Sequence, residues 1–331
     1  MGSEMCIRDR IEAVDKIIDT VKNDTDDTEF KLWSRIKETA IQGRRAGLGF
    51  TGLADAIAML GLKYDSDEGI SQVEQLMKVM FKGQLDSNID MAIERGAFPA
   101  WNGNLEEENR GRNNAWYDWV FLNDPEKYKR MMNCGRRNIS WSTVAPTGTV
   151  SIMAGTSSGI EPVFMPFYQR KRKCMSESDR VDYVDKVGEK YTLFTVVHPN
   201  LKRWAVETLN YSESEVNEWG LGVWKEVWKE SPYYGSTAPE IDWRQRVKLQ
   251  GVVQKYITHS ISSTVNLAKE TTEEEIADIY IEAWKQGLKG ITIYRDGCRE
   301  GVLTKVEKPK TIEGRDAPKS CLLYTSPSPR D

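Results

Sequence analysis

Residues 136–162, RRNISWSTVAPTGTVSIMAGTSSGIEP, carry the residue types and spacing best suited to chemistry, and that chemistry is phosphate binding. The β-branched run 139–144 predicts a strand, which turns at Pro146 into small hydroxyl and glycine residues. Proline lacks an N–H and fixes the turn, while Gly148 lets the backbone come close to an oxygen atom. Successive N–H groups beside threonine hydroxyls, at the start of a helix, are typical of an anion site. The segment therefore predicts a phosphate-binding loop.

A second glycine pattern suggests a dinucleotide site, but its context does not support one. Gly47, Gly49 and Gly52 spell G-x-G-x-x-G. That motif binds a dinucleotide only where a strand precedes it, and here the preceding residues are Gln-Gly-Arg-Arg. We therefore expect these glycines to allow close backbone packing where a short strand turns into a helix over 53–60.

Cysteine and histidine usage argues against several other kinds of site. No CxxC occurs, and the only histidines are His198 and His259. The sequence therefore predicts no metal site, no disulfide framework and no standard Ser-His-Asp triad. We interpret Cys134, Cys174 and Cys298 as ordinary thiols in a reducing, cytoplasmic setting.

Charge and hydropathy argue against nucleic-acid and membrane binding. The formal net charge is −4, whereas a nucleic-acid-binding domain is expected to be basic. The short basic run 170–173 is interpreted as a solvated strand end. No apolar run approaches the roughly 18 residues of a transmembrane helix, and no secretory signal is visible. We expect no direct nucleic-acid contact and no membrane insertion.

The two ends of the sequence do not look native. MGSEMCIRDR and SCLLYTSPSPRD resemble translations, in opposite orientations, of a transposase-type sequencing adaptor. We therefore expect residues 1–10 and 320–331 to be non-native, although short natural disordered tails are the alternative. Residues 11–300 are then the folded part and 301–319 a Lys/Glu/Pro-rich linker, so that the chain is a fragment cut at both ends.

The remaining patterns predict a mixed α/β protein rich in helices. Apolar periodicity predicts helices over 11–21 and 29–43, and a long one over 66–95 that is capped by Ser66. Near the other end, a strand, a capped helix and a strand over 261–294 predict a βαβ unit with parallel strands. Further helices are expected over 199–209, 212–229 and 242–259, with strand-like segments over 164–172 and 191–197.

Several motifs in series resemble the large catalytic subunit of ribonucleotide reductase. They are GRRAGLGFTGLADAIAMLG, RNISWSTVAPTGTVSIMAGTSSGIEPVF, HSISSTVNL, GLKGITIYRDG and RDAPK, in order over residues 43–319. The resemblance implies the C-terminal half of the family's ten-stranded α/β barrel, helix-rich and incomplete at both ends, over residues 11–300. It also implies reduction of ribonucleotides to 2′-deoxyribonucleotides by a radical mechanism, for DNA synthesis.

Within that family the chain is most similar to the adenosylcobalamin-dependent class II enzymes, because the pattern APTGT–SxxAG–SSGIEP is present. Enzymes that take a radical from a separate subunit carry two adjacent tyrosines near the last strand, and here only Tyr294 is present. The resemblance thus implies adenosylcobalamin as cofactor. The alternatives are a class I large subunit with a separate radical-generating subunit, an inactive nucleotide-phosphate-binding fragment, and a helical structural protein without a ligand.

The resemblance also implies roles for individual residues. The family's N-x-C-x-E radical motif does not occur, so we expect the catalytic residues upstream of Ile11 and the C-terminal redox cysteine pair beyond Lys319. Glu161 has a second interpretation, as a helix- or loop-capping carboxylate. The substrate diphosphate is expected on Pro146, Thr147, Gly148, Thr149 and Val150, and the cavity lining at Asn138, Ser142, Ser157, Ser158, Gly159, Ile160, Glu161 and Pro162.

Partners follow from the same resemblance. The expected partners are a ribonucleotide substrate and, for the full-length enzyme, a thioredoxin- or glutaredoxin-type reductant, with a homodimer as the assembly. Without the radical and redox cysteines, the chain itself is expected to bind nucleotide phosphate but not to reduce it.

Overall fold

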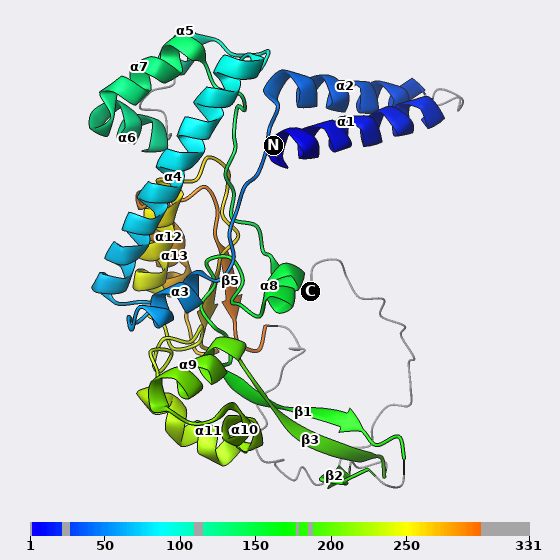
Figure 1. Ribbon diagram of the computed structural model, residues 1–331, viewed down its shortest axis with the longest axis vertical. Helices are drawn as coiled ribbons and strands as arrows, with labels where there is room; N and C mark the ends of the chain where they lie inside the picture. The colour runs from blue at the N-terminus through cyan, green and yellow to red at the C-terminus, as the bar shows by residue number, and fades with distance from the viewer. Residues whose placement is uncertain (1, 22–26, 109–114, 177–178, 185–187, 299–331) are drawn as a thin grey trace.

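A computed structural model describes residues 2–21, 27–108, 115–176, 179–184 and 188–298, and helices dominate it (Figure 1). The predicted linker 301–319 and the adaptor-like segment 320–331 lie outside the described residues. The described part of residues 1–10 is helical, as the beginning of α1. The helices are α1 (Gly2–Val21), α2 (Asp27–Gly43), α3 (Leu53–Met59), α4 (Asp67–Arg95), α5 (Gly103–Glu108), α6 (Ala115–Asn123), α7 (Pro125–Cys134), α8 (Gly148–Ala154), α9 (Pro199–Leu209), α10 (Glu213–Glu218), α11 (Leu221–Val227), α12 (Trp243–Gln254) and α13 (Glu273–Lys285), with a 3₁₀ turn at Trp228–Glu230.

Most helix predictions are confirmed because their signals are local. Ser66 caps α4 by accepting a hydrogen bond from the Gly69 amide at 3.0 Å, and Thr272 forms a capping box with Glu275 at the start of α13. The helix expected over 212–229 is wrong as a single element. Trp219 is extended between α10 and α11, and Gly220 follows it, so the helix ends and starts again.

Two small sheets are present among the described residues. Strands β1 (Phe167–Lys173) and β3 (Lys190–Val197) form an antiparallel hairpin, with β2 (Tyr183–Val184) at its edge. Together with α9, α10 and α11 it forms the lower part of Figure 1, called the hairpin region here (residues 167–241). Strands β4 (Thr264–Leu267) and β5 (Thr292–Arg295) are parallel and joined by α13, which confirms the predicted βαβ order.

The strand expected over 139–144 is wrong as a regular strand. The segment is extended and lies between 46–48 and 259–262, with only two isolated parallel bridges, Leu48↔Ser142 and Val144↔Ile261. A side chain interrupts the ladder, because the Thr258 hydroxyl accepts the amides of Trp141 and Ser142 at 3.0 and 2.9 Å. A backbone carbonyl would accept these N–H groups in a regular sheet.

The main core lies where α4 packs against α12 and the aromatic segments. Val73, Met77 and Phe81 of α4 are buried, while Leu76 is 37% exposed. The ring of Phe81 lies about 6 Å from each of four aromatic rings, and burying a side chain of this size stabilises the fold by about 3 kcal/mol. The four rings belong to Trp116, Trp119, Trp141 and Tyr256.

Arg136, at the start of the segment 136–162, is held by a carboxylate and by aromatic rings. Its guanidinium makes two hydrogen bonds to the carboxylate of Glu106, at 2.8 and 3.0 Å, and only 2% of the residue is exposed. Aromatic rings surround the cation at 5.0–5.7 Å, within cation–π range. This buried pair fixes one end of the segment. The rings are those of Phe98, Trp101, Trp116 and Trp141.

The glycines at 47, 49 and 52 have the packing role predicted for them. A Cβ on Gly49 would lie 2.6 Å from the Thr143 carbonyl oxygen, closer than real contacts allow. The Leu48 amide donates to the Trp141 carbonyl at 2.7 Å, so the two backbones are already in contact. Glycine is therefore needed here for close approach and not for binding a pyrophosphate.

We expect Gly49→Ala to destabilise the protein by about 1–3 kcal/mol, because the added methyl group must push back the Thr143 carbonyl. The matched control is Gly83→Ala on the exposed side of α4, where a Cβ meets nothing within 4 Å. Alanine favours the helix there, so this variant should be stabilised by about 0.5–1 kcal/mol. Urea denaturation measures both, and equal stabilities for the two variants would contradict the packing role.

Candidate functional site

The predicted phosphate loop, residues 146–150, lies where the extended segment ends and α8 begins (Figure 1). Thr147 is the N-cap and has a left-handed backbone with φ 51°, which turns the chain sharply into the helix. Pro146, Gly148, Thr149 and Val150 are exposed. No described residue accepts the N–H groups at positions 148–150, as expected for the first turn of a helix. The loop opens a helix, as the sequence predicted, but it follows an extended segment and not a regular strand.

A second loop, residues 155–161 (the serine loop), packs directly behind the first. Gly159 has φ 49°, and a Cβ there would lie 3.1 Å from the Ala145 carbonyl oxygen. The hydroxyls of Ser151 and Ser158 are 2.7 Å apart, and Ser151 also donates to the Gly148 carbonyl at 2.8 Å. The start of α8, which contains residues 148–150 of the phosphate loop, is therefore bonded through Ser151 to the serine loop.

The Ser157 end of the serine loop is held by three bonds. Its amide donates to Asp55 Oδ2 at 2.6 Å, and its carbonyl accepts from Thr51 Oγ1 at 2.6 Å and from the Gly52 amide at 2.8 Å. The Ser157 hydroxyl is buried and has no partner among the described residues. This end of the loop is thus fixed to the start of α3.

Asp55 is a buried carboxylate, 3% exposed, that accepts bonds from three different segments. Besides the Ser157 amide, Tyr233 donates its hydroxyl to Oδ1 at 2.7 Å, and His198 Nε2 lies 2.6 Å from the same oxygen. Burial acts to raise the pKa of Asp55, but the bonds and charge of His198, with the Ser157 amide and Tyr233, hold that pKa below its usual 3.8. Burial and the neighbouring carboxylate raise the pKa of Tyr233.

The other end of the serine loop is held by a buried ion pair. Glu161 Oε2 lies 2.6 Å from Arg246 Nη2, and Glu161 Oε1 accepts the Thr264 amide at 2.9 Å. Arg246 also donates to the Ile160 carbonyl at 2.9 Å and contacts the Tyr64 hydroxyl. Glu161 therefore caps the first residue of β4, which agrees with the capping interpretation. Burial raises the pKa of Glu161, and the charge of Arg246 partly opposes that rise.

Asn138 and Ser142 lie deeper than the two loops, and their polar atoms are engaged internally. Asn138 exchanges bonds with Asn88 and donates to the Arg44 carbonyl at 2.5 Å. The Ser142 hydroxyl accepts the Thr258 amide at 2.9 Å. Both residues are almost completely buried, so they hold the extended segment in place. Of the other predicted lining residues, Ser157, Gly159, Ile160 and Pro162 are buried, and Ser158 is half-buried.

The sequence interpretation missed the groups that position the loops, above all Asp55 and Arg246. A signal for each was available. Asp55 is the only charged residue in the apolar helix LADAIAM, and Arg246 stands beside Val247 on the buried side of α12. A charge on the apolar face of a helix indicates a buried polar partner. The partner's identity could not be derived from spacing.

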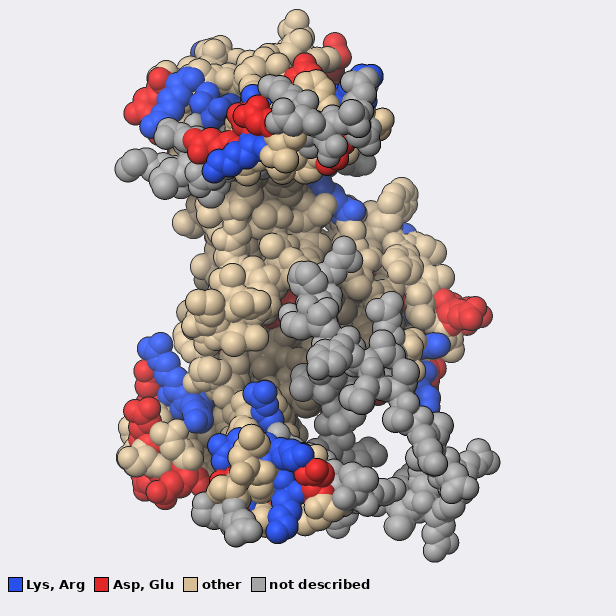
Figure 2. Space-filling model, turned by 90° about the vertical axis from the view of Figure 1, so that its right-hand side faces the viewer, with Lys and Arg blue, Asp and Glu red and all other residues tan. Residues whose placement is uncertain are grey.

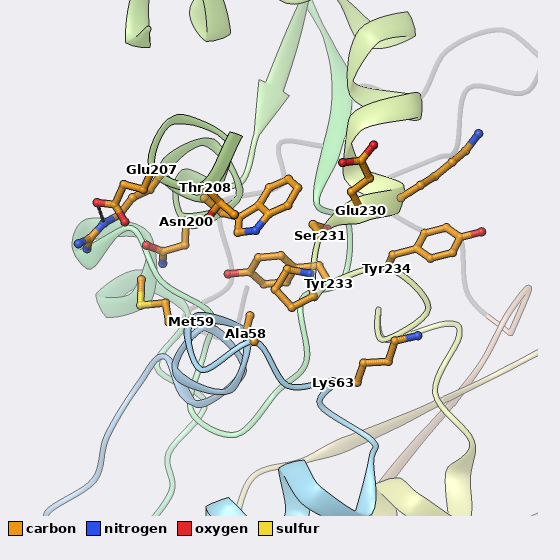
Figure 3. A pocket seen from close by; sticks show the side chains of 15 residues that line it. Ala58, Met59, Lys63, Asn200, Glu207, Thr208, Glu230, Ser231, Tyr233 and Tyr234 are labelled. Atoms are coloured by element: carbon orange, nitrogen blue, oxygen red, sulfur yellow. Dashed lines mark hydrogen bonds and ion pairs between the residues drawn. The ribbon is translucent and has the colours of Figure 1, made fainter. Parts of the chain in front are cut away.

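A cavity of about 650 Å³ is lined by Tyr233, whose hydroxyl bonds Asp55 (Figure 3). The connection from α3 to α4, the helix α9 and the segment 229–234 form its walls. Figure 3 shows Tyr233 at its centre, above Ala58 of α3. None of the predicted site residues lines this cavity. Its walls include Lys63, Asn200, Arg203, Trp204, Tyr233 and Tyr234.

Comparison with known proteins places these features in a family. The family described as "Ribonucleotide reductase, barrel domain" matches residues 4–294. A protein of Mycobacterium tuberculosis named vitamin B12-dependent ribonucleoside-diphosphate reductase is 30% identical over 309 residues, covering 92% of this chain and 38% of that protein. A protein of the same name from Thermoplasma acidophilum is 31% identical and covers 88% of this chain and 33% of its own length.

Relatives with another name and a solved structure also match. The ribonucleoside-diphosphate reductase subunit alpha of Helicobacter pylori is 27% identical, over 87% of this chain and 32% of that protein. The class Id ribonucleotide reductase alpha subunit of Actinobacillus ureae superposes with a TM-score of 0.55 at 17% identity, covering 87% of this chain and 44% of that one. The chain spans about a third to two-fifths of the length of these curated relatives.

We predict that Arg246→Met costs about 3 kcal/mol of unfolding free energy, because it leaves the Glu161 carboxylate without its buried cation. The double variant with Glu161→Gln should recover part of that loss, since the uncompensated charge is then gone. Chemical denaturation of the two single variants and the double variant gives the coupling energy. Strictly additive losses would contradict the pairing.

A pH prediction follows from Asp55, whose pKa is lower in the folded protein than the usual 3.8. A depressed carboxyl pKa contributes stability above the unfolded value, and that contribution is lost as the pH falls through the folded pKa. The difference in unfolding free energy between the wild type and Asp55→Asn should therefore be constant above about pH 5 and shrink below pH 3.8. Urea denaturation from pH 3 to 7 tests this, and a difference that stays constant at low pH would refute it.

Proposed function

The chain belongs to the ribonucleotide reductase barrel-domain family, and on that premise we propose that its phosphate loop binds the diphosphate of a ribonucleotide substrate. The longer enzyme would reduce the ribose to 2′-deoxyribose by a radical route. The observation that carries the proposal is the junction at Thr147. There, three successive amides open a helix, are exposed, and have no acceptor among the described residues. Such a set of N–H groups is the usual partner of a phosphate oxygen.

The surroundings favour recognition by amides and hydroxyls over recognition by cations. On the face that contains α8, charged side chains gather at the two ends and the middle consists mainly of other residues (Figure 2). Val150, Ile152 and Met153 of α8 are 58%, 82% and 84% exposed, so the helix presents apolar side chains around its polar start. The groups that α8 offers an anion are therefore amide dipoles and hydroxyls, because its sequence GTVSIMA contains no cation.

The serine loop is proposed as the wall that supports the bound substrate. Ser158 and the buried Ser157 hydroxyl supply polar atoms close to the phosphate loop, and Gly159 lets the two backbones come together. Ile160, Glu161 and Pro162 continue this wall. Asn138 and Ser142 would act from beneath, by holding the extended segment from which the phosphate loop emerges.

Binding without reduction is the activity proposed for these residues. The described thiols are Cys134 and Cys174, both half-buried, and the exposed Cys298. None stands in the N-x-C-x-E context that the family resemblance associates with the radical. We assign them no step of the reaction, and we assign the radical chemistry and the dithiol reduction to parts of the longer protein.

The cofactor belongs to the longer protein as well. Relatives are named vitamin B12-dependent, which suggests adenosylcobalamin as a radical source. We assign no described residue to it. Both histidines already use Nε2, His198 toward Asp55 and His259 toward the Ala46 carbonyl. In the same part of the chain, no three His, Cys, Asp or Glu side chains cluster as a metal site would require.

The remaining proposals concern class and partners. The single Tyr294, together with two vitamin B12-dependent relatives at 30 and 31% identity, favours class II over class I. A ribonucleotide substrate, a thioredoxin- or glutaredoxin-type reductant, a homodimeric assembly and a cytoplasmic location are proposed for the longer enzyme. None of the described helices is both long and apolar enough to span a bilayer.

Titration calorimetry of the chain with ADP tests the proposal. We expect measurable binding, and about tenfold weaker binding for Gly148→Ala, because the new methyl group would stand in the open space before the loop amides. Nothing lies within 4 Å of that methyl group, so folding should be unaffected.

The matched control is Gly222→Ala on α11, which also adds a methyl group into open space and should bind ADP normally. Equal affinity of the Gly148 and Gly222 variants would contradict the proposed loop. Nucleotide reduction by the chain with adenosylcobalamin and a dithiol would overturn the proposal that it only binds.

A further inference from the structure

We propose that Asp55 is a positioning residue for the phosphate loop, and that Tyr233 and His198 connect it to the hairpin region. The inference rests on the proposed function of the phosphate loop. It goes further by naming the residue that sets the loop's geometry and the part of the protein that can change that geometry.

The contacts form one continuous chain of bonds. Asp55 Oδ2 accepts the Ser157 amide at 2.6 Å, which fixes one end of the serine loop. Within that loop, Ser158 bonds Ser151 at 2.7 Å, and Ser151 bonds the Gly148 carbonyl at 2.8 Å. The first residue of α8 is therefore tied to Asp55 through three hydrogen bonds and the backbone between Ser157 and Ser158.

The other carboxylate oxygen faces the hairpin region. His198 lies between β3 and α9, and Tyr233 follows the turn Trp228–Glu230. Both bond Asp55 Oδ1, at 2.6 and 2.7 Å, and the rings of His198 and Tyr233 pack edge to face at 5.8 Å. A shift of this region would move the shared oxygen and, through Oδ2, the Ser157 amide.

Hydrogen bonds to both oxygens fix the position of the Asp55 carboxylate. A carboxylate that is 3% exposed requires donors on both oxygens, and these three supply them from parts of the chain 102, 143 and 178 residues away. Asparagine has one oxygen and one NH₂ group at the same place. If its NH₂ group faces the Ser157 amide, that bond is lost. If it faces Tyr233 and His198, their bonds must reverse direction and the negative charge beside His198 is gone.

The cavity beside Tyr233 leaves room for this ring to move, and with it the hydrogen bond from Tyr233 to Asp55. The ring of Tyr233 lines the cavity of about 650 Å³ while its hydroxyl bonds Asp55, so a movement of this ring would reach the carboxylate (Figure 3). Its neighbour Tyr234 lines the same cavity and is 42% exposed, but its hydroxyl bonds no other described residue. Tyr233 and the adjacent Tyr234 therefore provide a test position and a matched control.

The test measures pyrophosphate binding by calorimetry, together with hydrogen–deuterium exchange of the ligand-free chain. Tyr233→Phe removes one hydroxyl and should weaken binding about threefold, and Asp55→Asn about tenfold. Both should speed exchange over residues 155–161 more than in α13, where only the loss of global stability acts. Tyr234→Phe and the surface variant Glu207→Gln should match the wild type in both measurements.

The outcomes separate the two proposals. If the wild type binds pyrophosphate and Tyr233→Phe matches Tyr234→Phe in affinity and exchange, the positioning role is wrong and the phosphate loop stands. If exchange rises equally in α13, Asp55 serves general stability, which also overturns the inference. If the wild type binds no pyrophosphate, the proposed function fails and the inference fails with it.

Discussion

The carboxylate of Asp55 is the constraint on which the rest of the site depends. Removing a charge from water costs several kcal/mol unless hydrogen bonds replace the lost hydration. Asp55 meets that demand with an amide, an imidazole and a phenol drawn from three distant segments. Because all three must be present together, folding the carboxylate into place also brings α3, the serine loop and the hairpin region into one arrangement.

A second buried charge does the same at the other end of the serine loop. Arg246 is 2% exposed and contacts Glu161, the Ile160 carbonyl and the Ser263 hydroxyl. The loop is therefore held at both ends, by an acid at Ser157 and by a base at Glu161. Between these two points Gly159 lies against the Ala145 carbonyl, one residue before the phosphate loop, so the position of the exposed amides is set from behind. A loop held in this way needs little ordering when an anion binds, which favours affinity.

The sequence predicted well those features that depend on neighbouring residues. Ser66 and Thr272 mark helix starts through bonds three residues away, and the parallel order of β4 and β5 follows from the helix between them. Neighbouring residues could not show that the strand expected over 139–144 is interrupted. The Trp141 amide donates to the hydroxyl of Thr258, 117 residues away, where a regular sheet would have a backbone carbonyl. For the same reason a phosphate loop could be predicted from its own residues, whereas the roles of Asp55 and Arg246 could not. Their roles exist only through partners that the fold brings near.

The most direct measurement of the central claim is an amide NMR titration of the chain with ADP. Our account predicts that the amide signals of Gly148, Thr149 and Val150 shift together and saturate at one dissociation constant, since these N–H groups would gain phosphate acceptors. Signals of α13 should stay unchanged. Saturating shifts confined to other residues, with these three amides unmoved, would contradict the account.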